Sequence, residues 1–502
     1  MEENTNRSLA INTLILYGRL ILTSVFGLLT TRFALKTLGV TDFGLFSLIG
    51  SIMSFIAIIN TIMVSTSNRF IAVAIGQGDD KAINEQFNIN LLIHVAIAFV
   101  TLLFAFPLCE VYINNYLNFD GDLNAAKTVL YISVIGSVIS FISVPYNGLL
   151  MAKEKFIVFC GTETICSLIK LLLSISLVYI KENTLVVYAM GLSVLSALPT
   201  FVYYYYCKRQ YSSYVSFRLI KDKQKYKSVL SFSAWVGYGA IAYVAKTQGA
   251  AVLVNMFFNT IMNTALGIAN TVSTMLTMVT NAVVQPITPQ LTKSYAAGNF
   301  QNADRLLVLS VKLGYYSMFV IGAPLLLEME WLLNLWLGEV PQYAVSFSKL
   351  LVIDAMIISL NSGISTIIFA DGNIKLYQIS INTLRLVSLF LGYIVLKNGC
   401  SAEWLLIVYI IFSVIIFFTM QYVLHTTLNY SNSILFKHAY LPSILITIAF
   451  IPFVIITTNF SPVVRMSMSV IYSLILIYLL GMPEEEKITI RRLVFKWDVD
   501  DK

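Results

Sequence analysis

The stretch WLLIVYIIFSVIIFFTMQYVL at positions 404–424 holds no charged side chain. A helix needs about 20 mostly apolar residues to cross the hydrocarbon of a bilayer, so this segment predicts a membrane span. On either side of it, thirteen further apolar runs are long enough to do the same. They lie near 9–31, 43–67, 88–108, 126–150, 156–180, 185–206, 228–258, 260–290, 306–327, 344–370, 374–396, 438–459 and 463–481. Because helices satisfy all their backbone groups in hydrocarbon, we expect an all-α integral membrane protein with about 14 transmembrane helices.

The composition excludes an ordinary water-soluble enzyme. Of 502 residues, 58% are hydrophobic and only 12% are charged, whereas soluble domains carry about 25% charged residues. The five cysteines form no CxxC pair, and the sequence holds no HExxH, P-loop or GxSxG pattern. We therefore expect no catalytic site, no metal and no cofactor.

The distribution of Lys and Arg predicts the orientation. With an even number of spans, 22 of the 33 cations lie on the side of the N-terminus, 7 lie on the opposite side and 4 lie within spans. Cytoplasmic loops carry the excess of Lys and Arg in membrane proteins. We expect both termini in the cytoplasm.

A weak internal repeat, with an offset of about 220 residues, predicts two lobes. ILYG at 15–18 recurs as VGYG at 236–239, and AKEKF at 152–156 is echoed by ADGNIK at 370–375. Internal repeats are the usual construction of secondary transporters. The expected parts are an N-terminal six-helix lobe (1–206), a basic cytoplasmic linker (207–227), a C-terminal six-helix lobe (228–424), an additional helix pair (425–481) and a charged cytoplasmic tail (482–502).

The linker CKRQYSSYVSFRLIKDKQKYK combines seven cations with one acidic residue and several aromatic and aliphatic ones. This pattern suits an interfacial amphipathic helix on an anionic leaflet, and a simple positive-inside loop accounts for it about as well. In both interpretations the linker is a flexible strap.

Four basic residues fall within predicted spans: Arg19, Lys170, Lys246 and Arg385. Charges at such depth are costly and usually face a bundle interior or an aqueous cavity. Fewer acids lie at depth, chiefly Asp354 and, nearer the cytoplasmic rim, Glu163. The interior is therefore expected to be positive and to bind an anionic head group through these four cations. The alternative is a structural role, in which they pair with Asp354, Glu163 or helix carbonyls.

The seventh and eighth predicted spans carry an unusual number of polar residues. Those expected to line a cavity are Asn255, Asn263, Asn270, Thr274, Thr277 and Asn281. The last five recur at steps of 7, 4, 3 and 4, which places them on one helix face. Such a stripe lines a wet cavity or joins neighbouring helices through hydrogen bonds; we favour the cavity.

Several motifs resemble the polysaccharide-exporting members of the MATE-like (MOP) superfamily, and most closely the Wzx-type flippases of lipid-linked oligosaccharides. The first span with a mid-helix Arg19 is followed by these segments: LGVTDFG at 38–44, NRF at 68–70, AIGQGD at 74–79, SVPYNGLLMAKEKF at 143–156 and QPITPQLTKSYAAGN at 285–299. The resemblance implies two pseudo-symmetric six-helix lobes around a central cavity, two extra C-terminal helices and a place in the bacterial inner membrane. In that family Arg19 and Lys246 match cavity cations.

The implied function is the flipping of an undecaprenyl-pyrophosphate-linked oligosaccharide by alternating access, for O-antigen or capsule biosynthesis. Expected partners are this glycolipid, membrane lipids, a polysaccharide polymerase and glycosyltransferases, with no nucleic acid. Coupling to H⁺ or Na⁺ would use Asp354. The alternative functions are a MATE-type cation-coupled multidrug exporter, which would depend on Asp354 or Glu163, and a scaffold for polysaccharide synthases.

Overall fold

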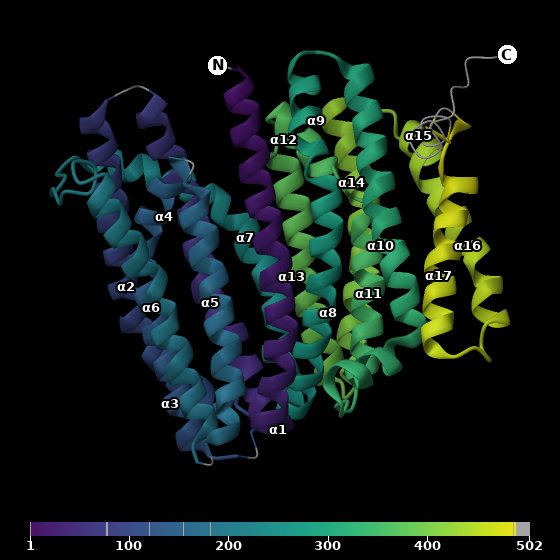
Figure 1. The fold of residues 1–502 in the computed structure, drawn as a ribbon, viewed down its shortest axis with the longest axis horizontal. Helices are drawn as coiled ribbons and strands as arrows, with labels where there is room; N and C mark the ends of the chain where they lie inside the picture. The colour runs from purple at the N-terminus through teal and green to yellow at the C-terminus, as the bar shows by residue number, and fades with distance from the viewer. Residues whose placement is uncertain are drawn as a thin grey trace. The chain divides into compact units, whose positions relative to one another are not determined.

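The computed structural model describes residues 2–76, 79–119, 121–153, 155–180, 182–484 and 486–487. Within these ranges every regular element is a helix (Figure 1), which confirms the all-α expectation. The helices group into two compact units, Met1–Gly267 (unit 1) and Ile268–Lys502 (unit 2).

Unit 1 is built from the first seven α-helices and the beginning of the eighth. They are α1 (Glu2–Gly76), α2 (Asp80–Asn115), α3 (Leu123–Phe141), α4 (Ser143–Ala152), α5 (Phe156–Ser176), the short η1 (Leu177–Tyr179), α6 (Thr184–Gln210), α7 (Lys223–Phe257) and α8 (Thr260–Val284). The repeat assigns α7 to the second lobe, but α7 packs along α1 in unit 1. The Ser233 hydroxyl on α7 bonds the Thr66 hydroxyl on α1 at 3.1 Å.

Unit 2 contains the remaining helices. They are the rest of α8, α9 (Ile287–Ala296), α10 (Phe300–Leu337), α11 (Ala344–Ser359), α12 (Ile364–Asp371), α13 (Lys375–Lys397), α14 (Glu403–Leu428), α15 (Asn432–Leu435), η2 (Phe436–Tyr440), α16 (Leu441–Ile456), α17 (Pro462–Leu476) and η3 (Ile477–Gly481). The predicted additional helix pair corresponds to α16 and α17, which pack against α10.

Ten helices of the described chain are long and apolar enough to cross a membrane, or eleven if the bent pair α11–α12 counts as one span. The chain is thus a multi-pass membrane protein, although the expected fourteen helices and the positions of the termini are not confirmed. The counts differ partly because α1 contains two predicted spans, divided where Gly39 leaves the helical region (φ 77°, ψ 174°). The polar helices α7 and α8 are not among the ten.

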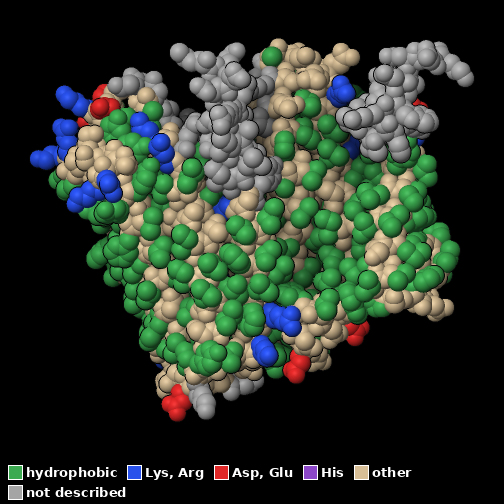
Figure 2. All heavy atoms as spheres, viewed as in Figure 1, with side chains coloured by type: hydrophobic (Ala, Val, Ile, Leu, Met, Phe, Trp, Pro, Cys, Tyr) green, Lys and Arg blue, Asp and Glu red, His purple; other side chains and the backbone are tan. Residues whose placement is uncertain are grey.

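The surface of each unit fits a bilayer. In Figure 2, hydrophobic side chains cover the middle of the helices, and Lys, Arg, Asp and Glu gather toward the helix ends. Large apolar side chains such as Phe201 (70% exposed) and Ile456 (73% exposed) would be unfavourable in water. In a membrane they face lipid.

In unit 1 a glycine allows α1 and α8 to approach closely. A Cβ atom on Gly44 of α1 would lie only 1.8 Å from the carbonyl oxygen of Thr260, the first residue of α8. The Thr264 hydroxyl, one turn further along α8, donates to the carbonyl of Val40 at 2.5 Å. This approach needs a residue without a side chain, which accounts for the second glycine of LGVTDFG.

Candidate functional site

Arg19 lies on α1 beside α5, the helix with which α1 packs in unit 1. Its guanidinium carbon is 5.2 Å from the centre of the Phe159 ring, an arrangement of a cation over an aromatic face. Its charge also acts on the carboxyl group of Glu163, one turn further along α5. The Arg19 Nε atom is buried and has no hydrogen-bond partner in the described part of the chain. Arg19 is therefore a partly buried cation with an unused donor.

Lys170 occupies the same helix as Phe159 and Glu163 at another level. It is seven residues beyond Glu163, and a rise of 1.5 Å per residue places it about 10 Å further along α5. Its side chain is exposed, among exposed apolar neighbours such as Ile169 and Leu172. Arg19 and Lys170 thus belong to one pair of packed helices, but they do not share one depth.

Lys246 is buried in unit 1 (7% exposed) on α7, which packs along α1. Unit 1 consequently contains three of the four predicted cations, carried by α1, α5 and α7. Each of these helices lies against α1 or is α1 itself. Arg385 belongs to unit 2.

Arg385 on α13 is oriented by a chain of side chains on its own helix. Its Nη1 donates to Asn382 Oδ1 at 2.9 Å, and the Asn382 Nδ2 donates to Gln378 Oε1 at 2.6 Å. Sequence reasoning missed Asn382 and Gln378. Their spacing in the sequence could have indicated this role, because Asn382 and Gln378 lie three and seven residues before Arg385 and therefore on the same helix face.

Asp354, the expected coupling residue, lies buried on α11 in unit 2 (8% exposed). The Ser413 hydroxyl on α14 donates to its Oδ1 at 2.5 Å, and the charge of Asp354 also acts on the buried Tyr409. Asp354 is therefore held by polar side chains of the neighbouring helix. Within the described residues no group of three or more His, Cys, Asp or Glu side chains is placed to hold a metal ion.

The polar stripe divides into two environments. Asn263, at the start of α8, is 1% exposed, and neither of its amide atoms has a hydrogen-bond partner among the described residues. Asn270 and Thr277 are partly exposed in unit 2, and Thr274 and Asn281 are exposed. Only this second part of the stripe is accessible along the α8 surface.

Asn255 has a different role from the one expected. It is fully buried, its Oδ1 accepts from the Tyr112 hydroxyl (3.1 Å) and the Asn118 backbone N–H (3.1 Å), and its Nδ2 donates to the Asn118 carbonyl (3.0 Å). These bonds fasten α7 to the end of α2. Asn255 thus joins helices, which was the alternative for the polar residues of this region.

The linker differs from the expectation that it is a flexible strap, and it does not form an amphipathic helix. Residues 211–222 are non-helical and lie along α2. The Asn84 Nδ2 donates to the carbonyls of Tyr214 (2.9 Å) and Ser216 (2.8 Å), and the Arg218 N–H donates to Asn88 Oδ1 (3.0 Å). The two asparagines replace the hydrogen bonds that a linker helix would have made itself.

Ionic and aromatic contacts complete the attachment of the linker. The Tyr214 hydroxyl donates to Asp80 Oδ1 at 2.9 Å, and this bond raises the pKa of Tyr214. The Lys153 ammonium lies over the rings of Tyr211 and Tyr214, at 5.9 and 5.0 Å from their centres. The linker is therefore an ordered part of unit 1.

Comparison with known proteins identifies the fold. Residues 17–180 match the family model MatE, and no curated protein sequence matches the chain. An inward-facing structure of a multidrug resistance MATE family transporter of the MOP superfamily superposes with a TM-score of 0.68 at 14% identity, covering 84% of this chain and 99% of the other. The lipid II flippase MurJ, in an inward closed conformation, also gives 0.68 at 14% identity, covering 97% of this chain and 100% of the other.

A third structure, a mutant of the MATE transporter VcmN from Vibrio cholerae, gives a TM-score of 0.57 at 14% identity and covers 86% of this chain and 98% of the other. The similarity therefore extends over nearly the full length of the solved chains. It shows that this chain has the fold that MATE transporters and MurJ share.

Proposed function

We propose that the protein is a flippase of the Wzx type, which moves an undecaprenyl-pyrophosphate-linked oligosaccharide across the bacterial inner membrane by alternating access. The observation that carries the proposal is Arg19, a cation within a membrane-crossing helix whose buried Nε lacks a partner among the described residues. Arg binds phosphate oxygens bidentately and stays charged in any protein environment. A pyrophosphate head group supplies the missing acceptor.

The other basic residues extend this interaction. Lys246 lies in the same unit on α7, and Lys170 is exposed about 10 Å further along α5 than Glu163. We infer that the head group contacts Arg19, and that Lys170 and Lys246 serve earlier or later positions on its path. Arg385 belongs to unit 2, where Asn382 orients its guanidinium.

The coverage of the two similar folds favours a lipid-linked substrate over a drug. The MurJ structure covers 97% of this chain, whereas the MATE transporter structure covers 84% at the same TM-score of 0.68. MurJ is a flippase of lipid II. A negative head group leaving the cytoplasm gains about 2.3 kcal/mol per charge for each 100 mV of membrane potential.

The decisive test is a flipping assay in proteoliposomes with a fluorescent lipid-linked oligosaccharide. Arg19→Ala is expected to lower the initial rate at least about tenfold, equivalent to about 1.4 kcal/mol, and Arg19→Lys is expected to retain part of it. Arg209→Ala, which removes an exposed arginine from the last turn of α6, is the matched control. Wild-type flipping by Arg19→Ala would refute the site.

A MATE-type exporter of organic cations is the second candidate, and the buried Asp354 favours it. A carboxylate held by Ser413 and acting on Tyr409 is a suitable site for a proton or Na⁺. The exporter predicts that Asp354→Asn abolishes efflux of cationic dyes from cells. Dye efflux by the wild type, together with no flipping in proteoliposomes, would establish this alternative and exclude the flippase.

A further inference from the structure

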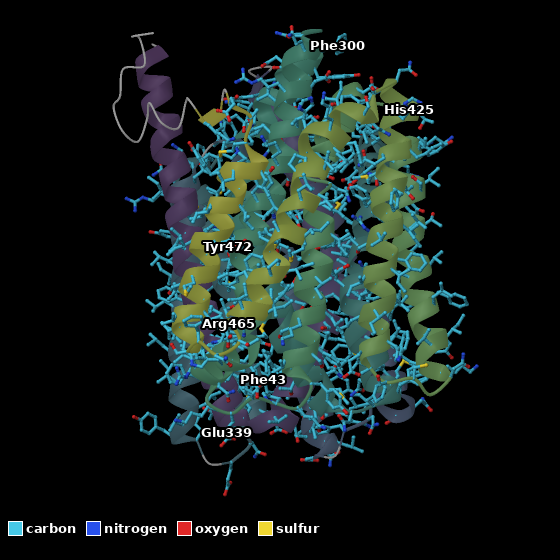
Figure 3. All side chains as sticks on the ribbon, turned by 90° about the vertical axis from the view of Figure 1, so that its right-hand side faces the viewer. Phe43, Phe300, Glu339, His425, Arg465 and Tyr472 are labelled. Atoms are coloured by element: carbon cyan, nitrogen blue, oxygen red, sulfur yellow. The ribbon has the colours of Figure 1, made fainter. Side chains whose placement is uncertain are left out.

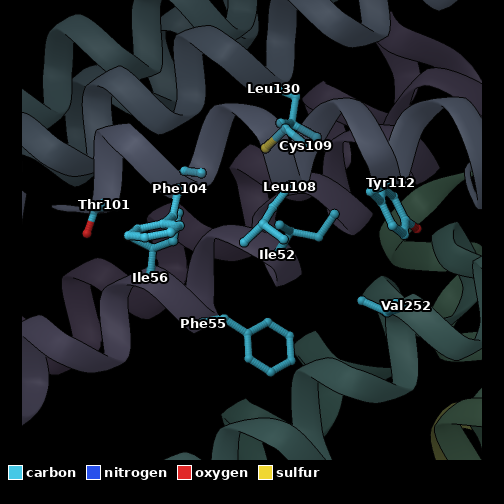
Figure 4. Close-up of a pocket in the computed structure, with 11 residues that line it drawn as sticks. Ile52, Phe55, Ile56, Thr101, Phe104, Leu108, Cys109, Tyr112, Leu130 and Val252 are labelled. Carbon is cyan, nitrogen blue, oxygen red and sulfur yellow. The ribbon is translucent and has the colours of Figure 1, made fainter.

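Unit 1 contains an apolar pocket of about 370 Å³ that is separate from the basic residues of α1 and α5. One face of α2 forms a wall with Thr101, Phe104, Ala105, Leu108, Cys109 and Tyr112, residues spaced alternately three and one apart as one helix face requires. The opposite wall comes from Ile52, Phe55 and Ile56 of α1, with Leu130 of α3 and Val252 of α7. Figure 4 shows Thr101 and Tyr112 at opposite ends of the space.

The environment of the pocket limits what can enter it. Phe104 (59%) and Leu108 (65%) are exposed at its mouth, whereas Ala105 (8%), Cys109 (6%) and Leu130 (2%) form its buried floor. The parts of α1, α2 and α3 that line it belong to helices long and apolar enough to cross the membrane. The mouth therefore opens to hydrocarbon, and a molecule arriving from water would have to cross lipid first.

The lining provides almost no polar group for a ligand. The Tyr112 hydroxyl already donates to Asn255, which leaves Thr101 as the polar side chain on the opposite end. Apolar cavities of this kind do not hold water, and the volume equals about a dozen water-sized groups. A flexible hydrocarbon chain fits both the shape and the chemistry.

A charged pair lies beside the Tyr112 end of the pocket. Glu110 follows the lining residue Cys109, and Lys127 precedes the lining residue Leu130 by one turn of α3. The Lys127 ammonium lies 3.3 Å from Glu110 Oε2, and the Tyr131 hydroxyl also donates to Glu110. Both charged side chains remain partly exposed, at 32% for Lys127 and 42% for Glu110.

We propose that this pocket is a phospholipid site, in which one acyl chain of a lipid with an amine head group fills the space between α1 and α2. Lys127 attracts the phosphate and Glu110 attracts the ammonium group, so the pair complements the opposite charges of the head group. The site is independent of the transported substrate. It provides unit 1 with a bound lipid that closes the gap between two of its helices.

Native mass spectrometry of the full chain, purified in mild detergent and supplied with phosphatidylethanolamine, tests the pocket. Wild type is expected to retain one lipid per chain. Ala105→Phe fills the floor and Leu108→Trp covers the mouth from an exposed position, so both are expected to lose that lipid. Val194→Trp, which introduces the same residue at an exposed position on α6, is expected to keep it.

Ala105→Phe changes a buried position and could fail to fold. Leu108→Trp avoids this problem, because Leu108 is largely exposed and its replacement needs no repacking. Equal retention by wild type and Leu108→Trp would overturn the site. Retention of undecaprenyl phosphate in preference to the phospholipid, when both are supplied, would overturn the assignment of the occupant.

The head-group assignment is tested by Lys127→Gln. Wild type is expected to bind phosphatidylethanolamine at least about threefold more tightly than phosphatidylcholine, whose methylated amine cannot donate hydrogen bonds to Glu110. Lys127→Gln is expected to weaken binding of both lipids, because it removes the partner of the phosphate. Equal binding of the two lipids by wild type would overturn the role of Glu110.

Discussion

Arg19 in unit 1 and Arg465 in unit 2 are both arginines of membrane-crossing helices, and their surroundings are opposite. Arg465 on α17 uses all three nitrogens: Nη1 donates to Glu328 Oε1 (2.7 Å), Nε to the Thr457 hydroxyl (3.2 Å) and Nη2 to the Val454 carbonyl (3.1 Å). Arg19 has an aromatic ring beside it and a buried Nε without a partner among the described residues. All three nitrogens of Arg465 thus have partners, whereas Arg19 keeps a buried donor that a ligand could use.

The contacts of Arg465 also show how the additional helix pair, α16 and α17, is attached to unit 2. Figure 3 shows Arg465 and Tyr472 on α17. Arg465 joins this helix to α10 where Glu328 leaves the helical conformation, and Lys312 of α10 contacts Glu486 at 2.7 Å. Between the two ion pairs, Phe319 and Phe450 pack edge to face at 5.3 Å. Ion pairs and aromatic packing thus fasten α16 and α17 firmly to unit 2.

Arg465→Ala is expected to cost the most stability. It leaves the Glu328 carboxylate, only 13% exposed, without its partner, and breaking a buried pair costs about 3–5 kcal/mol. The free energy of unfolding in detergent measures this cost, and adding Glu328→Gln should recover part of it. If Arg465→Ala lowered the free energy of unfolding no more than the control Arg209→Ala does, the difference drawn here between Arg465 and Arg19 would be wrong.

Asn88→Ala is expected to come next, with a cost of about 1–3 kcal/mol, because it removes two hydrogen bonds between α2 and the linker, each worth about 0.5–1.5 kcal/mol. The Asn88 Nδ2 donates to the Ser216 carbonyl at 2.9 Å, and its Oδ1 accepts from Arg218. Faster tryptic cleavage within 211–222 would accompany the loss. Asn115→Ala, which removes an exposed side chain bonded only within α2, serves as the control.

The pair of Lys312 and Glu486 tests the effect of burial within one ion pair of unit 2. Lys312 is 4% exposed and Glu486 is 38% exposed. Glu486→Ala leaves the buried Lys312 ammonium without its partner and is expected to lower the free energy of unfolding by about 1–2 kcal/mol. The loss is smaller than for a fully buried pair because solvent screens the exposed Glu486. Lys312→Met leaves a carboxylate that water can reach, so its free energy of unfolding should change less. The reverse order would contradict this account.

Arg19→Met is expected to change stability least, by no more than about 0.5 kcal/mol. Methionine keeps the apolar contact with the Phe159 ring, and no hydrogen bond of Nε is lost. Flipping should nevertheless fall as it does in Arg19→Ala. A stability loss comparable to that of Arg465→Ala would show that Arg19 is structural.

The apolar runs were sufficient to predict where the helices lie, because a span must be apolar over its whole length. Each of the fourteen predicted runs overlaps a helix of the structure, even though only ten of the described helices qualify as spans. The runs could not predict the order of the linker. Its hydrogen bonds come from Asn84 and Asn88, which are more than 120 residues away in the chain and resemble any other polar residues of α2.

The candidate site shows the same limit. Residue type and depth singled out Arg19, Lys170, Lys246 and Arg385, since charges in apolar segments are rare. They did not draw attention to Arg465, which lies near the start of the run 463–481 and proved to be the fully paired arginine. The asparagines were equally ambiguous, because Asn255 is hydrogen-bonded through both of its amide atoms, whereas neither amide atom of Asn263 has a partner among the described residues, although both side chains are buried.

The amino-acid sequence was therefore enough to predict an all-α membrane protein, the approximate extent of its helices and the few charged residues that lie within its apolar segments. Those properties depend on transfer from water to hydrocarbon, which acts on each segment separately. The folded arrangement was needed to establish which charges are neutralised, which amides join helices and where an apolar gap opens between α1 and α2. Hydrogen bonds and ion pairs require two groups within about 3 Å, and only the packing of helices distant in sequence brings such groups together.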